Sequence, residues 1–176
     1  MKDENPTFLA ALQSEDDIGK VIRAHIFIES LVGEFLSIAL SDVSHLNGAS
    51  LDYSQKVLLS LACGLRPDMK GALLYAGTLR NQFAHRPGQS INKQNMNNWY
   101  SEFSPDLKKS MAEILKKSGV SWAKGVQWAQ IPPTDRFVSM AMCAYYEMQI
   151  EIARISGEKK ISTLSGQIAK LVVKDA

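Results

Sequence analysis

Apolar residues recur at intervals of three and four positions along almost the entire chain, and strict alternation of apolar and polar residues is scarce. The first pattern is typical of α-helices, whereas alternation is typical of half-buried strands. With 176 residues, the chain is long enough for one domain with a substantial core. We therefore expect an all-α protein, a single helical bundle of about six to eight helices over the whole chain.

Prolines, glycines and capping residues divide this pattern into separate helices. Ser14 and Asp17 have the spacing of a capping box and open the longest expected helix, which runs to about Leu40. Gly157 is expected to end the last long helix, so that residues 158–176 form a separate C-terminal amphipathic tail helix. Further helices are expected over residues 6–12, 54–63, 67–85, 105–118 and 135–156, with a helical turn or two near 96–103 and an ordered loop over 119–133.

Two of the expected helices carry polar side chains in the middle of their apolar faces. His25 and Glu29 lie four positions apart, and therefore side by side, within the apolar stripe of the long helix. Arg80 lies at the centre of the apolar face of the helix over residues 67–85. A buried charge is costly alone and tolerable when it is paired. We therefore expect a buried ion pair between Glu29 and Arg80, with His25 beside it, where the two helices pack together.

Asn81 and His85 are also four positions apart, but they lie about 100° or more around the helix from Arg80. The histidine is close to the end of the helix, because Arg86 is followed by Pro87 and Gly88. We expect Asn81, His85 and Arg86 to form a binding surface at or near the interface of a homodimer. The structural alternative is that the histidine only stabilises the negative end of the helix dipole.

The stretch "LRNQFAH", residues 79–85, also carries the residues for metal-independent chemistry on a phosphate. A histidine acts as a general acid or base near neutral pH, and an arginine stabilises negative charge developing on a phosphate. The spacing of Arg80, Asn81 and His85 resembles the signature of HEPN-type helical domains. That resemblance implies a HEPN-like bundle and, in nuclease members, a catalytic motif that cleaves RNA without metal across a homodimer. Here Arg86 and Pro87 follow the histidine, where toxin-like members often have an aromatic residue.

A second resemblance covers more of the chain. The segment "IGKVIRAHIFIESLVGEFLSIAL" (residues 18–40) resembles the first long helix of the mannitol operon repressor family of small bacterial proteins. The segment "QKVLLSLACGL" (residues 55–65) and then "LRNQFAH" resemble later pieces of that family, in the same order. The resemblance covers a helical core of about residues 16–90. It implies regulation of transcription through contacts with a partner protein.

Composition and motifs argue against several other classes of protein. The net charge of +2 gives no strong argument for nucleic-acid binding. The N-terminal residues lack the apolar run of a secretory leader, and charged residues interrupt the most apolar stretch, so no membrane span is expected. Cys63 and Cys143 stand alone in helical patterns, which indicates free thiols and a cytoplasmic protein. The histidines and cysteines show no metal-ligand spacing and no cofactor-binding motif occurs, so no metal or cofactor is expected.

The sequence therefore favours a non-catalytic bacterial regulatory protein that acts on transcription through protein contacts. The alternative is a metal-independent HEPN-type ribonuclease in which Arg80, Asn81 and His85 are catalytic, and only this alternative requires RNA as a partner. The regulatory interpretation is preferred because its resemblance covers three segments in order, whereas the ribonuclease depends on one short motif.

Overall fold

The computed structural model describes the backbone of residues 5–13, 15–46, 48–86, 88–117 and 127–174. It describes the side chains of residues 8–13, 15–44, 46, 48–86, 88–115 and 127–161. Within this part of the chain there are seven α-helices and no strand, which confirms the expected all-α bundle. In chain order, the helices are α1 (Asn5–Gln13), α2 (Asp17–Ala39), α3 (Tyr53–Ala62), α4 (Lys70–His85), α5 (Lys93–Ser101), α6 (Pro105–Lys117) and α7 (Pro133–Lys174).

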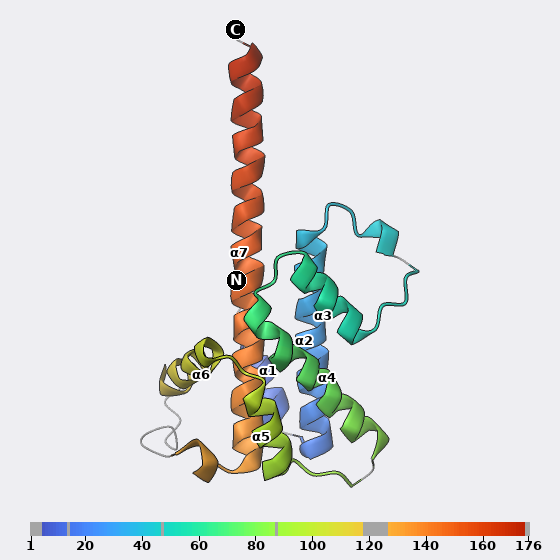
Figure 1. Cartoon of the computed structure of the whole chain (residues 1–176), viewed down its shortest axis with the longest axis vertical. Coiled ribbons are helices and arrows are strands. Elements are labelled where there is room, and N and C mark those ends of the chain that lie inside the picture. The colour runs from blue at the N-terminus through green and yellow to red at the C-terminus, as the bar shows by residue number, and fades with distance from the viewer. Residues whose placement is uncertain (1–4, 14, 47, 87, 118–126, 175–176) are drawn as a thin grey trace.

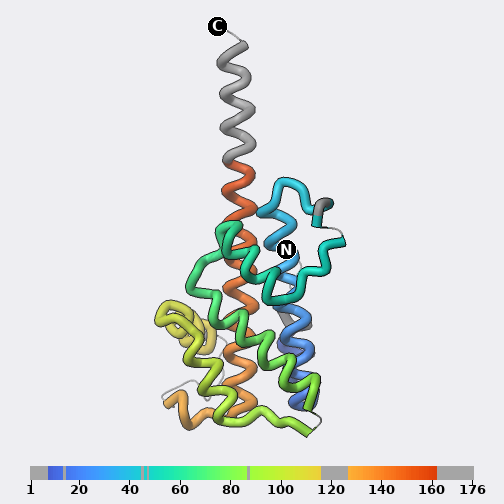
Figure 2. Tube along the Cα trace, turned by 45° about the vertical axis from the view of Figure 1, so that its right-hand side comes forward, coloured from blue at the N-terminus to red at the C-terminus, as the bar shows by residue number. Residues whose placement is uncertain are grey.

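The two longest helices, α2 and α7, pack along each other and form the centre of the bundle (Figure 1). Figure 2 shows α4 crossing this pair, with α3 beside the upper part of α2 and α5 beside the lower part of α7. On the other side, α6 crosses α7, and α1 packs against α2 and α7. One continuous apolar core lies between these helices, and its largest fully buried side chains include Trp99, Phe8, Phe35, Phe83, Phe103 and Phe137.

The start of α2 differs from the expected capping box. Asp16 is the N-cap, and its carboxylate accepts a hydrogen bond of 2.7 Å from the backbone N–H of Gly19. The carboxylate of Asp17 instead accepts from the backbone N–H of Ile91 at 2.9 Å, and so ties the loop after α4 to the start of α2. Ser14, the other member of the expected box, lies outside the described residues.

The C-terminal helix also differs from expectation, because α7 continues through Gly157 to Lys174. A single glycine inside a helix costs only about 1 kcal/mol, and neighbouring interactions offset this cost. Arg154 forms an ion pair with Glu158 across the glycine, with 3.0 Å between Nη1 and Oε1. Lys159 then donates to the backbone carbonyls of Ile38 and Leu40 at the end of α2. Residues 158–174 are therefore the continuation of α7, and the expected separate tail helix is wrong.

In the part of the chain that the structure describes, every helix is too short or too polar to cross a bilayer. Most of the loop expected over residues 119–133 lies outside the described part of the chain, and its end forms a short 3₁₀ turn, Trp128–Gln130. Both cysteines are free thiols, as expected, with Cys143 buried and Cys63 half-buried.

Candidate functional site

A polar pocket of about 410 Å³ lies between α2, the start of α3 and the second half of α4. It brings together polar side chains that are up to 56 positions apart in the sequence, from His25 to Asn81. We refer to it as the polar pocket. Its lining consists of His25, Glu29, Leu51, Asp52, Tyr53, Ser54, Gly77, Arg80 and Asn81.

The Glu29 carboxylate is paired with a residue of α3. The ammonium group of Lys56 donates to Oε1 of Glu29 at 2.8 Å, and Nδ1 of His25 lies 3.6 Å from Oε2. Within the described part of the chain, Glu29 has no ion pair with Arg80. The expected Glu29–Arg80 ion pair is therefore wrong, because α3 brings a lysine to the carboxylate. The expected neighbour His25 does lie beside Glu29.

Arg80 lies at the rim of the polar pocket and is exposed, so the expectation that it is buried is also wrong. Its Nη1 donates a hydrogen bond of 2.9 Å to Oδ1 of Asn81. Asn81 therefore lies beside Arg80, whereas the helical wheel predicted that it points to a different surface. His85 and Arg86 are exposed at the end of α4 and are not part of the lining. Of the three residues proposed as catalytic, the structure brings together Arg80 and Asn81 only.

Tyr53 and Gly77 shape the floor of the pocket. The Tyr53 ring packs against the His25 ring, with 4.4 Å between the centroids, and its hydroxyl donates to the Leu73 carbonyl at 2.9 Å. Burial, together with the negative charge of Glu29, raises the pKa of Tyr53 well above its ordinary value. Gly77 allows this close packing, because a Cβ atom there would lie 2.7 Å from Cδ1 of the Tyr53 ring.

His25 is the most buried polar side chain in the lining, with 4% of its surface exposed. Burial is the largest cause that lowers its pKa below the ordinary 6.5. The positive charges of Arg80 and Lys56 lower the pKa further, while the negative charge of Glu29 opposes the shift. His25 is therefore neutral at neutral pH and presents one nitrogen as a donor and the other as an acceptor.

Sequence reasoning found His25, Glu29, Arg80 and Asn81, but it missed the contribution of α3. The available signals were Asp52, which is typical of an N-cap, and the lysine four positions after it. In the structure, Asp52 accepts from the backbone N–H of Gln55 at 2.9 Å and completes a capping box. Among the described side chains, no three His, Cys, Asp or Glu residues cluster as metal ligands do. The pocket offers a ligand hydrogen-bonding groups and the positive charge of Arg80 at its rim.

Replacing Gly77 by alanine is expected to destabilise the fold by about 1–3 kcal/mol, because the added methyl group collides with the Tyr53 ring. Gly33 is the matched control, since it is also inside a helix but has no atom within 4 Å of an added Cβ. Gly33→Ala should stabilise the protein by up to about 1 kcal/mol through its higher helix propensity. Urea unfolding of both variants measures the difference. Equal effects of the two substitutions would contradict the packing described here.

The lowered pKa of His25 also predicts how stability depends on pH. The unfolded chain takes up a proton on this histidine at a higher pH than the folded protein does. The stabilising contribution of neutral His25 is therefore complete above the ordinary pKa of 6.5 and is lost as the pH falls through the lower folded-state pKa. Urea unfolding of His25→Gln should show a smaller loss of stability between about pH 7 and pH 5 than the wild type. An unchanged slope in His25→Gln would refute the prediction.

The chain matches no family model, no curated protein and no solved structure in comparisons of its sequence and fold with known proteins. Its resemblance to the mannitol operon repressor family and to HEPN-type domains therefore remains a prediction from the quoted segments.

Proposed function

We propose that this protein is a non-catalytic regulatory protein that binds a partner protein, and that the polar pocket recognises a carboxylate group of this partner. The observation that carries the proposal is the pairing of Glu29 with Lys56 at 2.8 Å. Because the lysine neutralises this carboxylate, Arg80 keeps a positive charge at the rim without an internal ion pair among the described residues. An arginine in this state is well suited to bind an external carboxylate.

The other polar groups of the pocket differ in charge. Asp52 is an anion at the pocket lining, and its Oδ1 accepts from the backbone N–H of Gln55 as the N-cap of α3. Asn81 orients the Arg80 guanidinium by accepting from Nη1. His25 is neutral and adds no charge to the pocket. Its Nδ1 lies 3.6 Å from the carboxylate of Glu29. Arg80 is therefore the cationic group that the pocket lining offers to an incoming carboxylate. Regulation of transcription through such a contact is the activity proposed from the sequence resemblance.

The positions of the histidines argue for binding over catalysis in a single chain. Cleavage of RNA without metal requires an acid or base beside the group that stabilises the phosphate. His25 is buried beneath Tyr53 and next to Glu29, while His85 is exposed outside the lining of the pocket. His25 lines the same pocket as Arg80 but has only 4% of its surface exposed, and His85 lies outside the lining, so neither of these two histidines is an accessible acid or base beside Arg80 in one chain.

The ribonuclease remains the second candidate because Arg80, Asn81 and His85 are all exposed on the last two turns of α4, where an RNA phosphate can reach them. This candidate needs two chains to assemble one site. It predicts metal-independent RNA cleavage that His85→Ala reduces by about a hundredfold or more. The regulatory proposal predicts that neither the wild type nor His85→Ala cleaves RNA in the presence of a chelator.

An NMR titration with a tetraglutamate peptide tests the proposed carboxylate site. The wild type should show saturable shifts at Tyr53, Gly77 and Asn81, and Arg80→Ala should weaken the binding by about tenfold, the typical loss of one charged hydrogen bond. Arg23→Ala is the matched control, because Arg23 is an exposed arginine already paired with Glu15 at 2.6 Å. Binding that is unaffected by Arg80→Ala, or shifts that avoid the pocket, would contradict the proposal.

A further inference from the structure

We propose that the ligand of the polar pocket carries an ammonium group beside its carboxylate, and that Asp52 binds this ammonium group while Arg80 binds the carboxylate. The inference rests on the proposed function, because it extends the recognition of a carboxylate to a second group of the same ligand. Asp52 lies at the start of α3 and Arg80 lies on α4, and both line the polar pocket. A ligand of this class is a zwitterion, with a negative and a positive charge at neutral pH.

The Asp52 carboxylate has capacity left for a ligand. Its Oδ1 accepts from the backbone N–H of Gln55 at 2.9 Å, and this hydrogen bond caps α3. An ionised carboxylate has about four acceptor positions on its two oxygens. Among the described residues, the carboxylate accepts no other hydrogen bond and forms no ion pair, and its side chain is exposed at the pocket. The remaining positions can therefore accept from an ammonium group, which is only a donor.

Asp52 and Arg80 have opposite charges and line one pocket, but they are not paired with each other. Within the described part of the chain, no ion pair joins the two side chains, although Arg80 is also exposed at the pocket. The Arg80 guanidinium donates from Nη1 to Oδ1 of Asn81, and its other N–H groups remain for a ligand. The pocket therefore holds a positive and a negative group that are separate. A ligand that presents a carboxylate to the first and an ammonium group to the second is complementary to both.

The charges of the pocket and of the lysine behind it cancel, which argues against a ligand that is only an anion. Glu29 and Asp52 are negative, whereas Lys56 and Arg80 are positive. Because Lys56 is paired with Glu29 at 2.8 Å, Asp52 and Arg80 are the charges left to meet a ligand. A carboxylate bound to Arg80 is repelled by the negative charge of Asp52 in the same pocket. An ammonium group on the ligand replaces this repulsion with an attraction.

The rest of the lining suits the carbon atoms that join the two charged groups. Leu51 and the Tyr53 ring supply apolar surface, and Ser54 adds an exposed hydroxyl. The volume of about 410 Å³ lies in the range of pockets that hold small ligands. In a partner protein, a glutamate and a lysine side chain that lie close together supply both charged groups. A free α-amino acid supplies the same two groups in one molecule.

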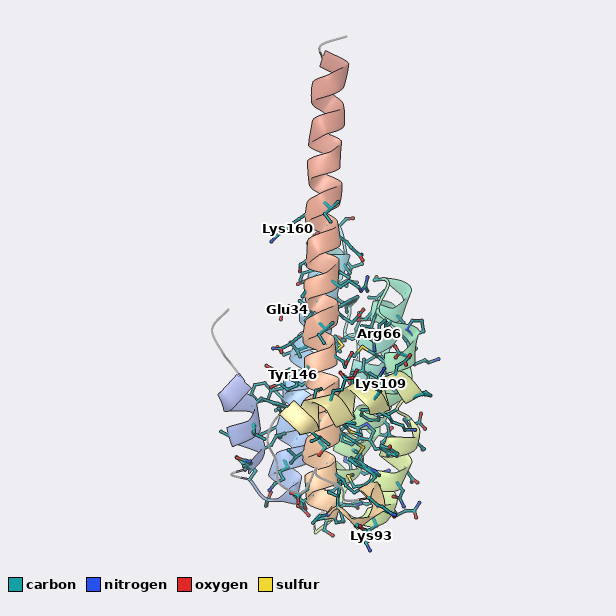
Figure 3. All side chains as sticks on the ribbon, turned by 90° about the vertical axis from the view of Figure 1, so that its left-hand side faces the viewer. Glu34, Arg66, Lys93, Lys109, Tyr146 and Lys160 are labelled. Carbon is teal, nitrogen blue, oxygen red and sulfur yellow. The ribbon has the colours of Figure 1, made fainter. Side chains whose placement is uncertain are left out.

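The polar pocket and the lysines of α6 lie on opposite sides of the molecule, so binding at the two places can be distinguished. In Figure 1, the start of α3 and the second half of α4 lie to the right of α7. Figure 3 shows the other side, where α6 with Lys109 lies in front of α7. Lys109 is exposed, so an acidic peptide held only by surface charge is attracted there. NMR shifts at Tyr53 and Gly77 therefore report the pocket, and shifts at Lys109 report non-specific binding.

Calorimetric titration of the full chain with two tetrapeptides tests the inference. Both peptides are acetylated and amidated. Glu-Lys-Glu-Lys presents carboxylates and ammonium groups, whereas Glu-Gln-Glu-Gln presents the same carboxylates without an ammonium group. The wild type should bind Glu-Lys-Glu-Lys at least about tenfold more tightly, the typical contribution of one charged hydrogen bond. Non-specific attraction would give the reverse order, because the net charge of +2 on the protein favours the more negative peptide.

The variant Asp52→Asn should remove this preference, because asparagine caps a helix as well as aspartate does but carries no charge. Asp42→Asn is the matched control. Asp42 is an exposed aspartate that also accepts from a backbone N–H, that of Ser44 at 2.8 Å, but it lies outside the lining of the pocket. This control should keep the full preference. Equal binding of the two peptides by the wild type, or a preference that survives in Asp52→Asn, would overturn the inference.

Competition with free alanine distinguishes the two sources of the ligand. Alanine carries a carboxylate and an ammonium group but no second charged side chain. Displacement of Glu-Lys-Glu-Lys from the wild type by alanine supports the inference with a free amino acid as the ligand. Tight binding of the peptide without displacement supports it with the side chains of a partner protein as the ligand.

The variant Arg80→Ala separates this inference from the proposed function on which it rests. It should weaken the binding of both peptides, because it removes the partner of the carboxylate. If Arg80→Ala weakens the binding of Glu-Gln-Glu-Gln but the wild type binds both peptides equally, the proposed function stands and the inference is overturned. If the wild type binds neither peptide, both are overturned.

Discussion

The arrangement of the polar side of this structure depends on how the negative charge of the Glu29 carboxylate is paired. Glu29 lies on α2, where its 31% exposed side chain would be costly to leave unpaired beside a buried histidine, and it faces both α3 and α4. Lys56 supplies the cation, and so the position of α3 is tied to the charge on α2. The start of α3 then carries Tyr53 over His25, and Gly77 provides the space for the Tyr53 ring on α4. The ion pair therefore joins α2 to α3, the Tyr53 hydroxyl joins α3 to α4 through the Leu73 carbonyl, and the pocket lies between the three helices.

This pairing also determines the chemistry proposed for the pocket. If Arg80 neutralised Glu29, the two charges would close the space between α2 and α4, and no cation would remain at the rim. Because Lys56 takes that role, Asn81 is the hydrogen-bond partner of Arg80 among the described side chains, and Arg80 keeps its charge for a ligand.

The sequence was sufficient to predict the helices, because helix formation follows from local spacing and from turn residues such as Gly64, which has φ +98° after α3. It also pointed to Glu29 and Arg80, which line one pocket, but it wrongly predicted that Arg80 is buried and paired with Glu29. Their partners were not predictable in the same way, because the choice between Lys56 and Arg80 depends on how α3 and α4 are rotated against α2. The continuation of α7 through Gly157 has a similar cause. Its supporting contacts come from Lys159 and the end of α2, more than a hundred positions earlier in the chain.

The most direct test of this account is a comparison of two double-mutant cycles by urea unfolding, one between Glu29 and Lys56 and one between Glu29 and Arg80. The substitutions Glu29→Gln, Lys56→Met and Arg80→Met remove the charges while keeping similar side-chain volumes. The account predicts a coupling free energy of about 1 kcal/mol for Glu29 with Lys56, and a coupling near zero for Glu29 with Arg80. The reverse result would contradict it, because Arg80 would then be the internal partner of Glu29 and the rim of the pocket would have no cation to offer.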